Sequence, residues 1–209
     1  MATSRRLSLR PRTVLGPRRP RHRPVLEVME GRLRLAGPPM GDLTEGNASD
    51  WGTFASDGAA ASVSDDATRV RDGAYSLRFE TASGFDTGVT FPAAGDAHWD
   101  LTGLTELTFW AYGDNSTIGW QGNQPVVVLK GPGGSFRYEP ISPVMSNGKW
   151  QKYHVPLAGG SRWTRTQSGS PSLGHINQVE IHQDTWDFGF TVYYDGVEFT
   201  GRRPGFPTA

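Results

Sequence analysis

The chain has 209 residues, of which 36% are hydrophobic and 20% are charged, with 27 glycines, 15 prolines and no cysteine. This composition is typical of a turn-rich globular domain, and the lack of cysteine excludes disulfide bonds, thiol catalysis and cysteine-ligated zinc. No stretch approaches the roughly 18 consecutive apolar residues of a membrane-spanning helix. The formal net charge of zero hides an asymmetry. Residues 1–34 hold ten Arg and two Glu, a net charge of +8, whereas 11 basic and 19 acidic residues follow, a net charge of −8.

The first predicted segment is a basic arm over residues 1–41. Dense proline between Arg10 and Pro24 prevents a helix and like charges repel one another, so we expect this part of the chain to be disordered. The apolar residues of Val25–Ala36 suffice for two helical turns, which are too short to be stable alone. Gly37–Gly41 is rich in residues that break secondary structure and marks the predicted domain boundary.

Three roles are open for this arm: binding to nucleic acid or an anionic membrane, targeting, and no role. The acidic remainder of the chain opposes binding to nucleic acid, so we expect no such partner. A secretory signal needs an apolar run of about 7–15 residues, and charged residues from Glu27 to Arg34 break every such run. The Leu-Glu-x-x-Glu-x-Arg-Leu pattern of Leu26–Leu33 resembles the LEPRLL-like segment of large bacterial surface and exported proteins. This resemblance implies a protein that is exported, extracellular or at the cell surface.

Residues 42–200 show short β-type runs between turn residues. In Ala74–Glu80, large apolar residues alternate with Ser, Arg and Glu, which is the two-residue period of a strand with one buried face. Some nine strands at this spacing, with no helical period, predict an all-β domain: an antiparallel β-sandwich or jelly roll, followed by a flexible tail over residues 201–209. The other clear strands are Leu104–Tyr112, Pro125–Lys130, Ser135–Tyr138, Trp150–Leu157, Gln178–His182 and Phe188–Tyr194, with Val197 and Phe199 closing the domain.

Sequence motifs in this segment follow the order seen in one family. Asp72–Leu77 opens a strand with Gly-Ala-Tyr-Ser-Leu, Trp150 opens a strand that ends in Val-Pro-Leu, and Tyr193–Val197 carries a Tyr-x-Asp-x-Val-like signature. Together they resemble jelly-roll carbohydrate-binding modules of the galactose-binding-domain-like superfamily, over about residues 42–200. The resemblance implies a monomeric, non-catalytic module that binds a polysaccharide or glycan.

Modules of this family usually hold a structural calcium ion where the first and last strands meet. Calcium takes about six to eight oxygen ligands from carboxylates and carbonyls. Transferred to this sequence, the resemblance implies carboxylate ligands from Glu45 and Asp195 and a backbone carbonyl ligand from Gly73. The alternative is that Asp195 only caps a turn with Gly196 and that Glu45 is solvated.

All seven tryptophans lie between Trp51 and Trp186, several of them beside turn residues. A half-exposed indole ring suits stacking on the apolar face of a sugar, while amide, carboxylate and guanidinium groups bind the hydroxyls. The alternative for each ring is burial in the core, where aromatic residues dominate packing. The predicted ligand-binding residues come from three loops and are Trp120, Gln121, Asn123, Trp163, Arg165, Asp184 and Trp186.

A second hypothesis is catalytic. Glu180, His182 and Asp184 alternate along a predicted strand and therefore share one face. The pattern resembles the Glu-x-Asp-x-Glu strand of jelly-roll glucanases, which act with paired carboxylates, although the middle and last residues differ in type. It implies a glycoside hydrolase. A polysaccharide lyase is also open, with His182 or a tyrosine as the base and an arginine that neutralises a uronate. A third hypothesis is a structural or adhesive surface domain without a specific ligand. We prefer the non-catalytic binding module.

Overall fold

The computed structural model describes residues 39, 41–114, 125–142, 147–184 and 189–201, with the side chains of Asp57 and Asp184 left undescribed. The chain divides into two compact units, residues 1–33 and 34–209, and every described residue belongs to the second unit. The predicted basic arm and flexible tail lie outside the described residues, apart from positions 39, 41 and 201. No helix in the described part is long and apolar enough to span a membrane.

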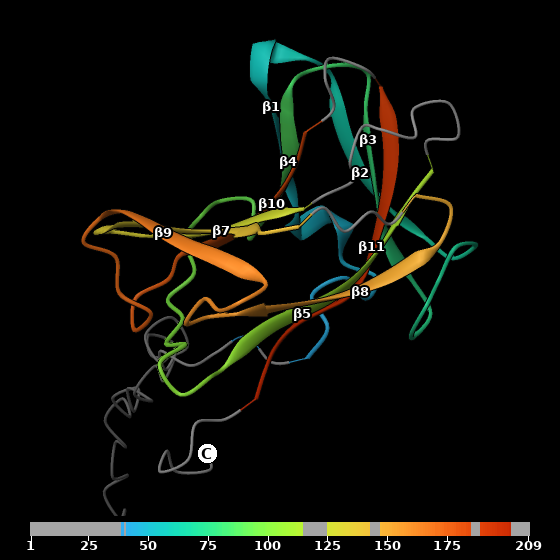
Figure 1. The fold of residues 1–209 in the computed structure, drawn as a ribbon. Helices are drawn as coiled ribbons and strands as arrows, with labels where there is room; N and C mark the ends of the chain where they lie inside the picture. Colours follow the sequence, from blue (N-terminus) through green and yellow to red (C-terminus); the bar gives the residue numbers. More distant parts are fainter. Residues whose placement is uncertain (1–38, 40, 115–124, 143–146, 185–188, 202–209) are drawn as a thin grey trace, which may run out of the picture. The chain divides into compact units, whose positions relative to one another are not determined.

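The described part of the second unit is a sandwich of two antiparallel sheets (Figure 1). The six-stranded sheet has the order β1-β4-β10-β6-β7-β9, and the five-stranded sheet has the order β2-β3-β11-β5-β8. Short 3₁₀ helices occupy Ala48–Asp50 and Ser56–Gly58. The predicted all-β sandwich is therefore confirmed. The strands are β1 Gly52–Ala55, β2 Ala61–Asp66, β3 Ser76–Thr81, β4 Asp86–Phe91, β5 Glu106–Gly113, β6 Val126–Gly131, β7 Gly134–Pro140, β8 Trp150–Pro156, β9 Trp163–Gly169, β10 Gln178–Asp184 and β11 Phe190–Thr200.

The core lies between the two sheets and is filled by every second side chain of the central strands. Leu77 and Phe79 of β3 and Val179 and Ile181 of β10 are fully buried, because alternate residues of a strand point to the same side. Burial of each such side chain stabilises the fold by about 1.5–3 kcal/mol. The outer face of each sheet carries the alternate residues, such as Arg78 and Glu80 of β3 and Glu180 and His182 of β10.

Hydrogen bonds join the beginning of the sandwich to its end. The Leu43 amide donates to the Val197 carbonyl (2.9 Å), and the Trp51 Nε1 donates to the Leu43 carbonyl (2.7 Å). The pairing of β11 with β5 shifts register between Asp195 and Glu198. At this irregularity the amides of Gly196 and Val197 donate to the Asp42 carboxylate, so residues far apart in sequence become neighbours.

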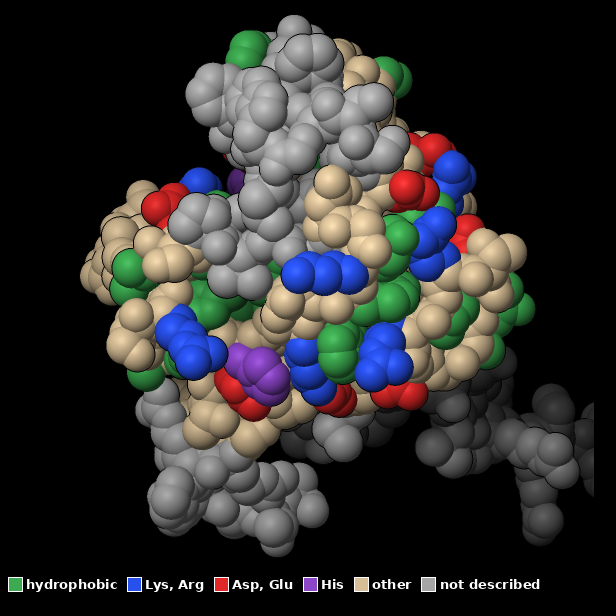
Figure 2. Space-filling model, turned by 45° about the vertical axis from the view of Figure 1, so that its right-hand side comes forward, with side chains coloured by type: hydrophobic (Ala, Val, Ile, Leu, Met, Phe, Trp, Pro, Cys, Tyr) green, Lys and Arg blue, Asp and Glu red, His purple; other side chains and the backbone are tan. Residues whose placement is uncertain are grey.

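Aromatic rings on the outer face of the five-stranded sheet are covered by cations. The Arg69 guanidinium lies 4.2 Å from the centroid of the Tyr112 ring, and the Arg71 guanidinium lies 4.5 Å from that of Trp110. Figure 2 shows one face of the molecule on which lysine and arginine side chains lie among hydrophobic ones. Because these guanidinium groups lie over the rings, the covered ring faces are not available for stacking on a ligand.

Candidate functional site

The outer face of the six-stranded sheet carries four charged or titratable side chains that form one continuous chain of contacts, here called the charged row: Asp86, His182, Glu180 and Lys130. The Nδ1 of His182 lies 2.9 Å from Oδ1 of Asp86, and its Nε2 lies 3.1 Å from Oε2 of Glu180. The Nζ of Lys130 donates to Oε1 of Glu180 (2.6 Å). The row crosses the adjacent strands β4, β10 and β6, so the sheet fixes the spacing of its members.

Phe54 of β1 packs against the row, with its ring centroid 4.4 Å from that of His182. Gly88 of β4 lies opposite both residues in the strand register. A Cβ atom at Gly88 would stand 2.7 Å from the Phe54 Cζ, closer than carbon atoms approach one another. Glycine at this position therefore lets the Phe54 ring lie over β4 and reach His182.

Glu180 is the buried centre of the row and is 5% exposed. Burial alone would raise its pKa, but hydrogen bonds from His182 and Lys130 outweigh burial and hold the pKa of Glu180 below its ordinary value. A general acid near neutral pH needs a raised pKa instead. The row can therefore offer fixed donors and acceptors to a ligand, while its central carboxylate stays ionised.

The predicted catalytic residues are brought together only in part. Glu180 and His182 are in contact, as their two-residue spacing on a strand predicts. Asp184 ends β10 and pairs with Asp86 in the register, but its side chain is among the undescribed ones. The sequence analysis missed Asp86 and Lys130, which belong to other strands and join the row only through sheet pairing.

Four of the predicted ligand-binding residues, Trp120, Gln121, Asn123 and Trp186, lie outside the described residues. The strand ends that flank them are described. β6 begins at Val126, which pairs with His182 near the end of β10. Because β6 and β10 are antiparallel neighbours, the chain enters and leaves this sheet at the same end, beside Asp86 and the charged row.

The half-exposed ring predicted at Trp163 is wrong. Trp163 is 5% exposed and belongs to the core, with its ring 6.5 Å from that of Tyr153. Arg165 lies two residues further along β9 and therefore faces the same inner side, where its guanidinium lies 3.9 Å from the Phe136 ring centroid. Both residues thus close the edge of the sandwich, and Thr164 between them faces solvent.

Residues predicted to bind calcium meet at the junction between the first and last residues of the sandwich. Asp195 is fully buried, and its Oδ2 accepts hydrogen bonds from the amides of Arg71 (2.6 Å) and Asp72 (3.1 Å). Its Oδ1 has no hydrogen-bond partner among the described residues. Burial raises the pKa of Asp195, and the nearby charge of Asp42 raises it further, against the lowering effect of the two amides.

Glu45 holds the other side of the same turn. Its carboxylate accepts hydrogen bonds from the amides of Ala74 (2.9 Å) and Tyr75 (3.4 Å). Gly73 has a φ of +68°, and a Cβ atom there would collide with the Glu45 carboxylate. The turn at residues 71–75 therefore contacts both predicted carboxylates, Glu45 and Asp195.

The sequence analysis did not predict that Asp42 belongs to this junction. Its Oδ1 accepts from the Val197 amide (3.1 Å), and its Oδ2 accepts from the Gly196 amide (3.2 Å). Oδ1 also accepts from the Thr44 amide, and this Asp-x-Thr turn is a signal that the sequence does carry. Within the described ranges, no three His, Cys, Asp or Glu side chains converge at metal-binding spacing. A calcium ion here would thus need backbone carbonyls as well as carboxylates.

No protein-family model and no curated protein matches the sequence. Solved structures do match the fold. The family 11 carbohydrate-binding module of the cellulosomal cellulase Lic26A-Cel5E of Clostridium thermocellum has a TM-score of 0.54 and 13% identity, over 79% of this chain and 95% of that chain. The family 11 module from the same organism in complex with a β-1,3-1,4-mixed-linked tetrasaccharide has a TM-score of 0.54 and 13% identity, over 78% of this chain and 98% of that one.

An exo-β-agarase structure also matches, with a TM-score of 0.57 and 14% identity, over 79% of this chain but 26% of the agarase chain. At these identities the likeness concerns the fold. The chain has the β-sandwich of carbohydrate-binding modules, which agrees with the resemblance noted in the sequence motifs.

Proposed function

We propose that this sandwich is a non-catalytic carbohydrate-binding domain and that its polysaccharide or glycan ligand lies along the outer face of the six-stranded sheet. The charged row carries the proposal, because it presents hydrogen-bonding groups in fixed positions across three strands. Groups that are already ordered lose little conformational entropy when a ligand binds. The solved module of the same fold in complex with a tetrasaccharide supports the assignment.

The members of this face have different roles. The side chains of Asp86 and Lys130 are 55% and 49% exposed, so they reach the ligand and bind its hydroxyls. Glu180 and His182 hold these two ends in place, and Phe54 offers an apolar ring beside them. The proposal keeps four ligand contacts predicted from the sequence, Trp120, Gln121, Asn123 and Trp186, which lie outside the described residues.

In this proposal the domain binds a sugar chain without cleaving it. Hydrogen bonds from His182 and Lys130 lower the pKa of Glu180, so this carboxylate is unsuited to act as the general acid of a glycoside hydrolase. We also propose that the protein acts outside the cell, where such polysaccharides occur, as a domain that needs no second copy. Export through the LEPRLL-like segment remains part of this proposal.

Calcium is a further part of the proposal. The orphaned Oδ1 of Asp195 and the raised pKa of its carboxyl group are features that a cation would relieve. Asp195 and Glu45 would supply carboxylate oxygens, and Gly73 would supply a carbonyl. The ion would neutralise a buried charge and join both ends of the sandwich.

A glycan microarray probed with the purified full chain tests the proposed function. We expect binding to at least one oligosaccharide class, and the Lys130→Ala variant should reduce that binding about tenfold or more through the loss of a charge-assisted hydrogen bond. Arg78→Ala is the matched control, since Arg78 is paired with Glu80 on the five-stranded sheet. Equal binding by the wild type and the Lys130→Ala variant would contradict the placement of the ligand.

A further inference from the structure

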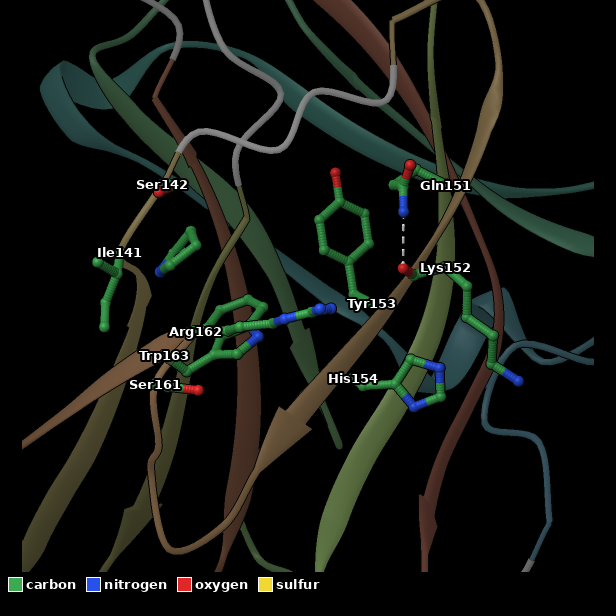
Figure 3. Close-up of a pocket in the computed structure, with 10 residues that line it drawn as sticks. Ile141, Ser142, Gln151, Lys152, Tyr153, His154, Ser161, Arg162 and Trp163 are labelled. Atoms are coloured by element: carbon green, nitrogen blue, oxygen red, sulfur yellow. Dashed lines mark hydrogen bonds between the residues drawn. The ribbon is translucent and has the colours of Figure 1, made fainter.

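A second concave site lies at the edge of the sandwich, away from the charged row. Strands β8 and β9 are edge strands of different sheets. Together with the end of β7 they enclose a cavity of about 340 Å³ (Figure 3). Small-molecule sites usually have volumes of about 300–1,000 Å³. The cavity therefore lies at the lower end of the size range of small-molecule sites.

The lining of the cavity, here called the edge pocket, combines apolar, polar and basic side chains. No described lining residue is acidic. The rest of the domain is acidic, because residues 35–209 carry a net charge of −8. The edge pocket is thus a local basic site on an acidic surface. Its lining residues are Pro140, Ile141, Tyr153 and Trp163 (apolar), Ser142, Gln151 and Ser161 (polar), and Lys152, His154 and Arg162 (basic).

The three basic residues differ in what they already contact. His154 is paired with Glu106, with 3.2 Å between Nδ1 and Oε2. The Nζ of Lys152 lies 5.5 Å from the centroid of the Trp110 ring. Among the described residues, no carboxylate pairs with Arg162. In Figure 3 the Arg162 side chain extends toward Tyr153. Its guanidinium is therefore available to an incoming anion.

The backbone around Arg162 is fixed on both sides. The Arg162 carbonyl accepts from the Ile141 amide (2.9 Å), and the next carbonyl, that of Trp163, accepts from the Gly160 amide (2.9 Å). The preceding turn is fixed by the Tyr138 hydroxyl, which donates to the Leu157 carbonyl (3.0 Å). A guanidinium on an ordered backbone binds a ligand at a lower entropic cost than one on a free loop.

We propose that the edge pocket binds a uronic acid residue of a saccharide, with the sugar carboxylate on the guanidinium of Arg162. The planar guanidinium matches a carboxylate in geometry and donates two parallel hydrogen bonds to it. The apolar wall at Ile141 faces the hydrophobic side of the pyranose, and the polar rim at Gln151 and Ser161 binds hydroxyls. This site is distinct from the outer face of the six-stranded sheet and does not depend on it.

Nuclear magnetic resonance titration of the ¹⁵N-labelled full chain with methyl β-glucuronide tests the proposal. Saturable shifts are expected for amides of residues 140–142, 151–154 and 161–163. Methyl β-glucoside, which lacks the carboxylate, and acetate, which lacks the ring, should each bind at least about tenfold more weakly. The Arg162→Ala variant should weaken glucuronide binding by about tenfold, whereas the control Arg78→Ala should not change it.

A second variant keeps the test decisive if Arg162→Ala does not fold. Ser161 is exposed at the rim, so Ser161→Glu places a carboxylate beside Arg162 and should abolish glucuronide binding. Equal shifts with acetate or with methyl glucoside would overturn the proposal, as would unchanged binding in the Arg162 and Ser161 variants. Shifts confined to β4, β6 and β10 would also overturn it, while leaving the proposed function intact.

Discussion

Two buried carboxylates in this molecule have pKa values that are shifted in opposite directions. Glu180 in the charged row is 5% exposed and Asp195 at the junction is fully buried, and burial alone would raise the pKa of both. Lys130 and His182 reverse the effect for Glu180, whose pKa is lowered. Asp195 has only backbone amides, and Asp42 adds a like charge, so its pKa stays raised. The partners of a buried acid, rather than its depth, decide whether its pKa is raised or lowered.

This difference separates the proposed ligand site, the charged row, from the proposed calcium site, the junction. The charged row is neutralised by residues of its own sheet, so it can present its ends to a sugar without further help. The junction keeps an uncompensated charge and an orphaned oxygen. Its two-carboxylate arrangement around one turn is what a hard cation would complete.

The largest expected effect is the stabilisation of the fold by bound calcium. At a free concentration about 100 times its dissociation constant, bound calcium would stabilise the fold by about 2.7 kcal/mol, which raises the melting temperature by about 5–10 °C. Asp195→Asn should abolish this response, and Glu180→Gln should preserve it. Thermal unfolding with calcium and with EDTA measures both. A wild-type melting temperature that EDTA leaves unchanged would contradict the proposed calcium site.

Neutral substitutions of the two acids come next. Without metal at pH 7, Glu180→Gln should lower the free energy of unfolding by about 1–2 kcal/mol, because the charge-assisted bonds from His182 and Lys130 are lost. This figure is modest because the Lys130 side chain is half exposed and screened by water. Asp195→Asn should change the free energy of unfolding by less than about 1 kcal/mol, because the side-chain oxygen of Asn still accepts hydrogen bonds from the two backbone amides.

Urea denaturation of both variants and the wild type in EDTA measures this contrast. A larger loss for Asp195→Asn than for Glu180→Gln would reverse the comparison.

The dependence of stability on pH should have opposite signs for the two acids. Asp195 has a raised pKa in the folded state, so its protonation stabilises the fold as the pH falls from neutrality toward the ordinary Asp value of about 3.9. Glu180 has a lowered pKa, so its stabilisation is present above the ordinary Glu value of about 4.3 and is lost as the pH falls through the folded-state pKa.

Denaturation curves of the metal-free protein between about pH 3 and pH 7 should therefore separate the variants. Asp195→Asn removes a gain on acidification, and Glu180→Gln removes a loss at the acid end. Parallel curves for wild type and both variants would show that neither acid titrates as described.

The smallest effect is expected at an exposed ion pair. Arg78 and Glu80 are paired on the outer face of the five-stranded sheet, with side chains that are 35% and 41% exposed. Arg78→Ala should change the free energy of unfolding by less than about 0.5 kcal/mol, because exposed pairs contribute little. A loss above 1 kcal/mol on the same denaturation assay would disqualify this variant as the control for the binding experiments.

Much of the fold follows from the sequence, but mainly where large apolar residues alternate. The strand over Ser76–Thr81 could be predicted because Leu77 and Phe79 alternate with polar residues. Strands Gly52–Ala55 and Asp86–Phe91 hold few large apolar residues (Phe54, Val89 and Phe91) and were not predicted, although both pair along their whole length in the sheet. Such short strands form because they pair with neighbouring strands, and their own sequence carries too little alternation of apolar and polar residues to predict them.

The candidate site is predictable to a lesser degree for the same reason. The spacing of Glu180 and His182 placed them on one face, but Lys130 and Asp86 are 50 and 96 residues away from their partners. Contacts at such separations arise from sheet register and leave no local signal. The turn residues before Trp163 suggested a loop, yet strand direction turns its ring inward.

The most direct test of the central claim is to map amide shifts in the ¹⁵N-labelled chain with whichever neutral oligosaccharide binds on the microarray. The account predicts saturable shifts along β4, β10 and β6, centred on Asp86, His182 and Lys130, and their loss in the Lys130→Ala variant. Shifts confined to the five-stranded sheet, or no binding by any oligosaccharide of the array, would contradict it.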